Sequence, residues 1–335
     1  MFIAHVPIIS PEETSRKPVS VMSFEIGRET QAAQAPLYAR VRNELENLAV
    51  GRAPNDRSPL PNEAELSEMF NVSRGTLRRA VAELAADGLL RVEQGRGTFV
   101  DPEEQVRRRV WAQLRRVAHP DSRFDLDLSY FIPDFEGRER CDEQFLALDV
   151  WRDAEVIFIA PDNNLENLRR RALSEGRSIV VPTYGMRRGF VRLDGQRLDP
   201  GDHGLAATLD GMERVGRRVS LDGLKALGVI NLIVTGAVGV STVNGAQVGL
   251  TQRYHAIETA ILSELGLLDD STQVIVSAHD CQLLDFPLMP EENRCQLIVT
   301  PNRLIRCHGY QAASEINNGN ETSRVVPFRD RPLTA

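Results

Sequence analysis

The sequence predicts an α/β protein in two parts: a small N-terminal module of three helices and a β-hairpin, and a C-terminal three-layer α/β domain. Three observations support this prediction. The chain has 335 residues, enough for two domains. Helix-capping signals and a hairpin pattern precede residue 101, and apolar strands alternate with amphipathic helices after it. The predicted boundaries are a tail at 1–34, the N-terminal module at 35–101, the α/β domain at 102–310 and a polar tail at 311–335.

The three N-terminal helices follow from spacing and caps. Apolar residues recur every three or four positions from residue 36 until Gly51, which predicts the first helix. Asn62 can cap a short second helix, and Ser73 can cap a third that ends at Gly88. Two short helices joined by a tight turn form a helix-turn-helix.

The third helix is the predicted DNA-reading helix. Its first turns carry arginines and contain no acid before Glu83. Arginine can bind guanine through two hydrogen bonds in the major groove, and the free N–H groups at the helix start, with Ser73, can bind a phosphate. The polar residues of these turns are Arg74, Thr76, Arg78 and Arg79.

The segment after the third helix predicts a β-hairpin. Two alternating apolar stretches within residues 89–100 lie on either side of Gln94-Gly95-Arg96-Gly97. Such a hairpin is a wing that can lay Gln94, Gly95 and Arg96 along the DNA backbone or minor groove. The module is therefore a predicted winged helix-turn-helix.

Residues 36–100 resemble the winged-helix DNA-binding domain of the GntR family of bacterial regulators. The matching features are Leu60-Pro61, the Val72-Ser73-Arg74 turn, the Asp87-Gly88-Leu89 helix exit and the Gly95–Thr98 wing. The resemblance implies that double-stranded DNA is the partner. The implied contacts are Ser73, Arg74, Gly75, Thr76, Arg78, Gln94 and Gly95, to which the wing pattern adds Arg96.

The chain departs from this family pattern at two positions. Many members carry an arginine where this chain has Ala64, and a threonine or alanine where it has Gly75. We therefore expect an unusual preferred DNA site. The alternative is a winged helix that contacts proteins, with arginines that are merely solvated.

Net charge alone argues against a DNA-binding protein. The chain has 40 basic and 47 acidic residues, a net charge of −7. Between positions 36 and 100, however, nine basic residues match nine acidic ones, so the whole excess of negative charge lies outside the N-terminal module. The acidic remainder is expected to weaken non-specific DNA binding.

The cysteine spacing and the hydropathy of the chain exclude several other classes of site and segment. The four cysteines lie far apart without metal-binding or redox spacing, so we expect free thiols, no metal site and no cofactor. The first residues lack the basic segment of a signal peptide, and no run of about 18 uncharged apolar residues occurs. We therefore expect a cytoplasmic protein without a membrane span.

The C-terminal part begins with predicted helices at 102–117 and near 143–151. Buried strands separated by helices follow, which argues for a sheet with helices on both faces. Ligands on such sheets bind beyond the carboxyl ends of the strands. The predicted strands are 155–160, 178–182, 190–194, 231–238, 273–279 and 296–300.

Residues 105–306 resemble the 5-formyltetrahydrofolate cyclo-ligase family in the order and spacing of several stretches. These are RRRVWAQL, RRALSEGRSIVVP, NLIVTGAVGVSTVNGAQVG, AHDCQLLD and QLIVTPNRLI. The resemblance implies an enzyme that closes a formyl-folate ring with ATP and magnesium. The family's glycine-rich loop is reduced here to Gly249 and Tyr254, and Asn231 and Asn293-Arg294 replace acidic and His-Asp positions. Because a phosphate cradle needs glycine, we expect no ATP-dependent turnover.

The α/β domain is instead expected to bind a small-molecule effector, folate-like or nucleotide-like. For three of its candidate residues a structural role is the alternative: a solvated helix end for Arg177, a structural histidine for His279 and a core aromatic for Tyr254. The candidates are Arg177, Gly236, Gly249, Tyr254, His279 and Thr300.

Taken together, the sequence predicts a bacterial transcriptional regulator, a repressor that acts as a homodimer on operator DNA under effector control. One alternative is an ATP-dependent 5-formyltetrahydrofolate cyclo-ligase with a fused DNA-binding domain. Another is an α/β domain that serves only dimerisation.

Overall fold

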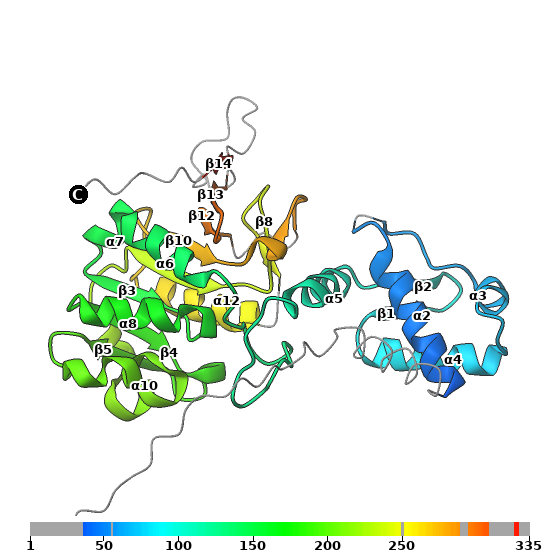
Figure 1. Ribbon diagram of the computed structural model, residues 1–335, viewed down its shortest axis with the longest axis horizontal. Coiled ribbons are helices and arrows are strands. Elements are labelled where there is room, and N and C mark those ends of the chain that lie inside the picture. Colours follow the sequence, from blue (N-terminus) through cyan, green and yellow to red (C-terminus); the bar gives the residue numbers. More distant parts are fainter. Residues whose placement is uncertain (1–35, 55, 249–250, 289–293, 308–324, 328–335) are drawn as a thin grey trace, which may run out of the picture. The chain divides into compact units, whose positions relative to one another are not determined.

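The computed structural model describes residues 36–54, 56–248, 251–288, 294–307 and 325–327. The chain divides into two compact units, and the division falls at Val100-Asp101 (Figure 1). Of the described residues, 36–49 and 57–100 form the first unit, and the short segment after 49 together with those from 101 onward forms the second.

The first unit contains three helices and a hairpin, as predicted. Its elements are α2 (Leu37–Gly51), α3 (Glu63–Met69), α4 (Arg74–Ala86), β1 (Leu90–Glu93) and β2 (Gly97–Val100). Each helix contributes a leucine that is almost fully buried, Leu45 from α2, Leu66 from α3 and Leu84 from α4. Each leucine belongs to the apolar face that the spacing predicts for its helix, so all three helices bury that face within the first unit.

The second unit is built on a nine-stranded sheet (Figure 1). The strand order is β14 (Val325–Pro327), β13 (Arg303–Arg306), β12 (Leu297–Val299), β10 (Gln273–Ser277), β7 (Leu232–Gly236), β3 (Val156–Ile159), β4 (Ser178–Pro182), β5 (Phe190–Asp194) and β6 (Arg217–Val219). From β12 to β4 the strands are parallel, and antiparallel strands flank them on both sides. The chain passes from β3 to β4 on one side and from β7 to β10 on the other. The neighbours β3 and β7 therefore form a topological switch point, where a ligand crevice is expected.

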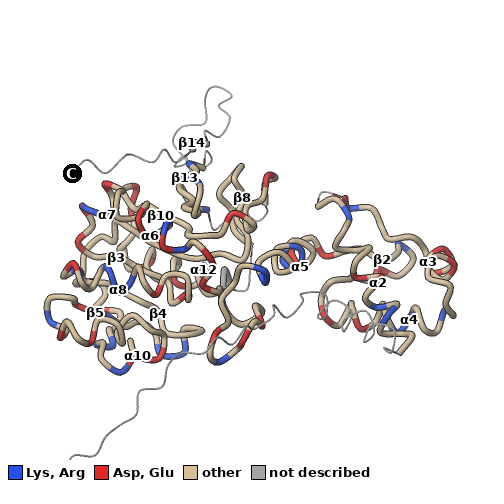
Figure 2. Tube along the Cα trace, viewed as in Figure 1, with Lys and Arg blue, Asp and Glu red and all other residues tan. Residues whose placement is uncertain are grey.

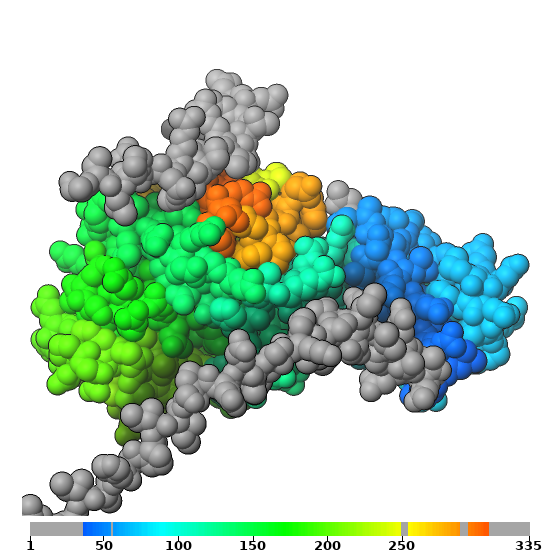
Figure 3. Space-filling model, in the orientation of Figure 1, coloured from blue at the N-terminus to red at the C-terminus, as the bar shows by residue number. Residues whose placement is uncertain are grey.

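Helices cover both faces of this sheet, which confirms the predicted α/β class. Side chains alternate along β3, so that Ile157 and Ile159 enter one core and Phe158 the other. The first core is covered by α6 (Arg138–Ala147), α7 (Asp149–Asp153), α8 (Glu166–Ser174), α9 (His203–Ala207) and α10 (Leu209–Val215). The second is covered by α11 (Leu221–Lys225) and α12 (Thr251–Glu264). In the space-filling view the green α6 segment lies beside the orange β12–β13 segment (Figure 3), where Gln144 donates to the carbonyl oxygen of Thr300.

A three-stranded sheet that the sequence analysis did not predict lies beside the large one. It consists of β11 (Leu283–Leu284), β8 (Gly239–Ser241) and β9 (Gln247–Val248). Helix α5 (Pro102–Leu114) packs against β8 and β9. The short connections include the 3-10 helices η1 (Asn163–Leu165), η2 (Tyr184–Met186), η3 (Pro200–Asp202) and η4 (Asp280–Gln282).

Two details differ from the sequence expectations. The helix expected near 143–151 is two helices, because Leu148 is extended (φ −74°, ψ 137°) and ends α6 as it begins α7. The predicted polar tail contains the edge strand β14, whose Val325-Val326 pair is typical of a strand. The other residues of 311–335 and those of 1–34 lie outside the described residues. Within the described ranges, no helix is long and apolar enough to cross a membrane.

Candidate functional site

The helix-turn-helix of the first unit is fixed by its caps. Asn62 accepts hydrogen bonds from the backbone N–H groups of Ala64 and Glu65, and the Glu65 carboxylate accepts one from the Asn62 N–H, a reciprocal capping box. Asn71 takes a left-handed conformation (φ 52°) in the turn. Ser73 Oγ then accepts from the Thr76 N–H at 3.2 Å and begins α4. Short polar side chains thus set the angle at which α4 leaves the turn.

Helix α4 packs beside the acidic helix α3, and the Cα trace shows basic positions on the first and acidic positions on the second (Figure 2). The arginine side chains of α4 are 69% exposed at Arg74 and 71% exposed at Arg78. Glu63 pairs with both, at 3.9 Å and 2.9 Å. Arg79 stacks on the ring of Tyr38, with 3.6 Å from its guanidinium carbon to the ring centre. An exposed ion pair adds little stability, so a phosphate or base can replace Glu63 at small cost.

The wing presents an exposed tip, Gln94, Gly95 and Arg96. Gly95 (φ +76°) lies in the left-handed region that favours glycine. Gly97 (φ +124°) lies so close to Pro59 that an added Cβ would be 3.0 Å from the proline Cβ. Arg96 is paired with Glu93 within the wing. The predicted DNA contacts therefore fall into two groups, one at the start of α4 and one at the wing tip, and all of them except the partly buried Thr76 are exposed.

The second unit contains a pocket of about 490 Å³ at the switch point between β3 and β7. Ala160 to Asn163 follow β3, Tyr184 and Gly185 follow β4, Thr235 lies at the end of β7, and Val238 follows that strand. The segment 128–132 and the start of α12 close the other sides. The pocket thus lies where the fold predicts ligand binding.

The floor of the pocket is acidic and buried. Asp162 accepts a hydrogen bond from the Gly236 N–H at 2.8 Å, while Glu258 and His255 reach the pocket from α12. Burial raises the pKa of Asp162 to about 6, with the nearby Glu258 carboxylate adding to the effect and the Gly236 hydrogen bond opposing it. His255 Nδ1 lies 3.8 Å from a Glu258 oxygen, too far for a hydrogen bond.

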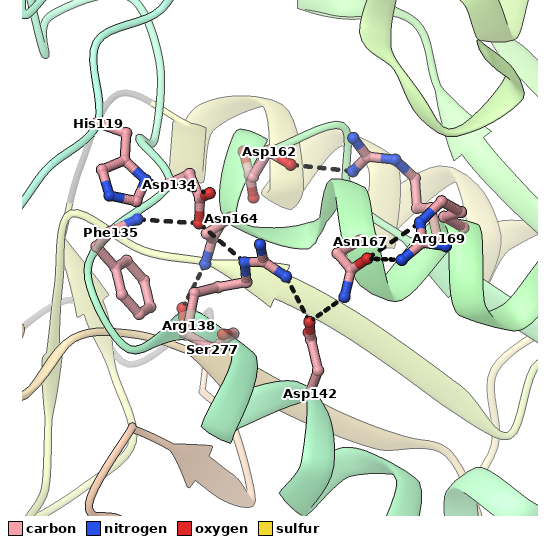
Figure 4. Close-up of polar contacts among 11 residues, drawn as sticks. His119, Asp134, Phe135, Arg138, Asp142, Asp162, Asn164, Asn167, Arg169 and Ser277 are labelled. Carbon is pink, nitrogen blue, oxygen red and sulfur yellow. Dashed lines mark hydrogen bonds and ion pairs between the residues drawn. The ribbon is translucent and has the colours of Figure 1, made fainter. Parts of the chain in front are cut away.

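A buried arginine fixes the loop that carries Asp162. Arg169 of α8 donates to the backbone carbonyl oxygens of Ala160, Asp162 and Ala207 at 2.6, 3.0 and 2.7 Å. Burial lowers the pKa of Arg169 to about 10, and the side chain stays charged at neutral pH. Figure 4 shows this contact beside the bond from Asn164 to the carbonyl oxygen of Ser277.

Aromatic rings line the walls of the pocket. Tyr130, Phe131, Tyr184 and Tyr254 all contribute. Tyr184 donates to the carbonyl oxygen of Tyr130 at 3.0 Å, and Phe124 stacks behind Tyr130 with ring centres 5.3 Å apart. The pocket therefore combines aromatic walls with an acidic floor.

The structure brings few of the predicted effector residues to this pocket. Tyr254 lines it, and Gly236 lies beneath it, where an added Cβ would be 2.9 Å from Ile132. Arg177 does not line it, because its guanidinium donates to the carbonyl oxygens of Trp151 and Ala154 at the end of α7. Gly249 lies outside the described residues.

His279 and Thr300 follow β10 and β12, away from the pocket lining. His279 Nδ1 accepts from the Cys281 N–H and begins η4, and burial lowers the pKa of this histidine. Thr300 donates to Asp280 at 3.0 Å. Both residues form bonds that hold their own loops.

Comparison with known families agrees with this architecture. Residues 101–301 match the model of the 5-formyltetrahydrofolate cyclo-ligase family. The chain belongs to this family. Residues 37–100 match the model described as "Bacterial regulatory proteins, gntR family" and are a GntR-type helix-turn-helix domain. Both resemblances noted in the sequence are thereby confirmed.

Individual relatives cover one part or the other of this cyclo-ligase-family chain. It is 28% identical over 212 residues to the methenyltetrahydrofolate synthase domain-containing protein of Bos taurus, covering 61% of this chain and 53% of that protein. The chain thus spans about half the length of that relative. It is 44% identical over 69 residues to the probable fructoselysine utilization operon transcriptional repressor of Escherichia coli (strain K12), covering 20% and 28%. A crystal structure of the AraR DNA-binding domain in complex with operator ORR3 is 39% identical, covers 20% of this chain and 80% of that one, and has a TM-score of 0.19.

The acidic floor of the pocket was not predicted from the sequence. Asp162 follows the buried strand β3 after two residues. A carboxylate just beyond a strand end is a signal that could have indicated it. His255 and Glu258 are three positions apart on α12, which places both on one helix face. No spacing in the sequence, however, indicates that this helix face meets the loop after β3.

Proposed function

We propose that this protein is a transcriptional repressor that binds operator DNA in the cytoplasm as a homodimer and is controlled by a small molecule in the α/β pocket. The observation that carries the DNA-binding part is the pair of exposed arginines on α4, Arg74 and Arg78, in a helix-turn-helix of GntR type. The carboxylate of Glu63 pairs with both and is the group that DNA must displace. The exposed wing tip supplies a second DNA contact.

Selection of bound fragments from genomic DNA with the full-length protein tests this proposal. We expect an operator with two half-sites about 34 Å, or a multiple of that distance, apart. Arg74→Ala or Arg78→Ala should each cost about 1–3 kcal/mol of operator binding in fluorescence anisotropy. Arg171→Ala, an exposed position on α8, is the matched control. Unchanged binding in both α4 variants would contradict the assignment.

Effector control is supported by the position of helix α5. Val110 belongs to one buried cluster with Val238, and Leu114 belongs to another with Leu128 and Phe131. Val238, Leu128 and Phe131 all line the pocket. Only Asp101, which caps α5, separates this helix from strand β2 of the wing. A ligand that moves the pocket wall therefore acts directly on the helix that continues from the DNA-binding unit.

The control step is tested by measuring operator affinity with and without compounds that raise the melting temperature of the protein. We expect such a compound to change operator affinity, and Val110→Ala to reduce that change by loosening the contact between α5 and the pocket wall. Equal affinity with and without every stabilising compound would remove the control function and leave the DNA-binding function intact.

We further propose that the α/β domain does not catalyse ATP-dependent cyclo-ligation. The pocket floor carries two carboxylates, and the Gly236 N–H, a backbone donor at this strand end, is already bound to Asp162. Both features disfavour a phosphate. ATP hydrolysis that depends on 5-formyltetrahydrofolate in the purified protein would overturn this part of the proposal.

A further inference from the structure

Two titratable side chains of the pocket have bonding capacity that the fold does not use. The Glu258 side chain is 6% exposed and that of His255 is 7% exposed. Among the residues that the structure describes, His255 Nδ1 has no hydrogen-bond partner, and no side chain donates a hydrogen bond to Glu258, whose ionic contact is with that nitrogen at 3.8 Å. A buried carboxylate without donors is costly, so these atoms call for a ligand that brings N–H groups.

The aromatic walls of the pocket favour a flat, positively charged ligand. Tyr130, Tyr184 and Tyr254 present aromatic rings around the pocket, and Phe131 adds a fourth. The face of an aromatic ring attracts a cation, with an energy that grows as water is excluded. A planar group can also stack between such rings.

The arginine that lines the pocket is already neutralised. Arg123 binds the Asp121 carboxylate at 2.8 Å and lies 3.6 Å from Asp210. The hydrogen bonds from Arg123 hold the pKa of Asp121 well below its usual range. Asp121 also accepts from Asn163 at 2.7 Å. An anionic ligand would therefore face two carboxylates with no free arginine or lysine among the described lining residues to offset them.

From this geometry we infer that the pocket binds a planar organic cation, an aromatic amidine or guanidine, with its N–H groups on Glu258 and Asp162 and its ring among the tyrosines. The inference rests on the proposed function in treating this pocket as the effector site, and it names the class of effector. A cation forms charge-assisted hydrogen bonds with the two carboxylates and is attracted to the tyrosine rings. A neutral analogue of the same shape has only the contacts with the rings.

Three probes of one shape separate these contributions. Benzamidine, benzamide and benzoate carry the same ring with a positive, neutral and negative substituent. We expect titration calorimetry on the full-length protein at pH 8 to give at least about tenfold tighter binding of benzamidine than of benzamide, and no binding of benzoate. Glu258→Gln should abolish the preference for benzamidine. Glu264→Gln, an exposed position on the same helix, should retain it.

Four binding results count against the inference. Equal binding of the three probes, a preference for benzoate, or no benzamidine binding overturns it, as does a Glu258→Gln variant that keeps the preference. If tryptophan fluorescence shows that Glu258→Gln does not fold, Asp162→Asn takes its place, and the same loss of preference is expected. Benzamidine binding that leaves operator affinity unchanged would retain this site and remove the control function proposed above.

Discussion

The buried carboxylate of Asp162 is expected to lower the unfolding free energy of the α/β unit at neutral pH. The group is charged at neutral pH although its pKa is raised to about 6, from 3.8 in an exposed chain. One pKa unit corresponds to about 1.4 kcal/mol, so the ionised group costs about 3 kcal/mol of unfolding free energy above pH 7. Glu258, His255 and Arg169 face this group, and burial is the dominant cause of its shift. Asp162→Asn removes the charge and keeps an oxygen to accept from the Gly236 N–H.

We therefore expect Asp162→Asn to stabilise the α/β unit by up to about 3 kcal/mol at pH 8 and by about half as much at pH 5. The pH dependence follows because the folded-state pKa lies above the unfolded one. Folding then takes up a proton between about pH 4 and 6, and stability is lost as the pH rises through that window. A residue that destabilises its own domain in this way is typical of a binding site.

Urea unfolding followed by tryptophan fluorescence measures this effect selectively. The chain has two tryptophans, Trp111 and Trp151, and both belong to the second unit. Asp270→Asn, at an exposed turn of the same unit, is the control and should change stability little at any pH. A stabilisation by Asp162→Asn that is the same at pH 5 and pH 8, or a loss of stability at pH 8, would refute the reasoning.

Three further predictions follow from the contacts. Glu63→Gln removes the ion pair with Arg78 and should tighten DNA binding by up to about 1 kcal/mol at low salt, a gain that anisotropy should show shrinking as salt rises. Arg177→Ala leaves two backbone carbonyls without their donor and should cost about 1–3 kcal/mol in urea unfolding, with operator affinity unchanged. Gly97→Ala forces a side chain into the left-handed region against Pro59, so operator binding should weaken while the tryptophan-reported unfolding transition stays in place.

The N-terminal unit could be predicted almost completely because its determinants are local. Asn62 and Ser73 cap their helices through bonds to residues three positions along the chain, and Gly95 takes the left-handed conformation that its own turn requires. The exposed arginines of α4 could be assigned to one surface from helical spacing alone. What the sequence did not show is the pairing with Glu63, which comes from the preceding helix and depends on how α3 and α4 pack.

In the α/β unit, strands and helices could be predicted from apolar periodicity, but the site could not. Arg177 was a candidate for effector binding, whereas the fold brings its guanidinium to the carbonyl oxygens of Trp151 and Ala154 at the end of α7. Asp162, from the loop after β3, meets Glu258 of α12 only because β3 and β7 are neighbours in the sheet.

The sequence by itself determined the two families, the order of the elements and the arginine-bearing face of α4, since caps, turns and apolar periods act over a few residues. The tertiary structure alone decided which strand ends adjoin one another. That choice places two carboxylates and a ring of tyrosines in one pocket and sets α5 against its wall. Strand order depends on contacts between segments far apart in the chain, and no local pattern records it.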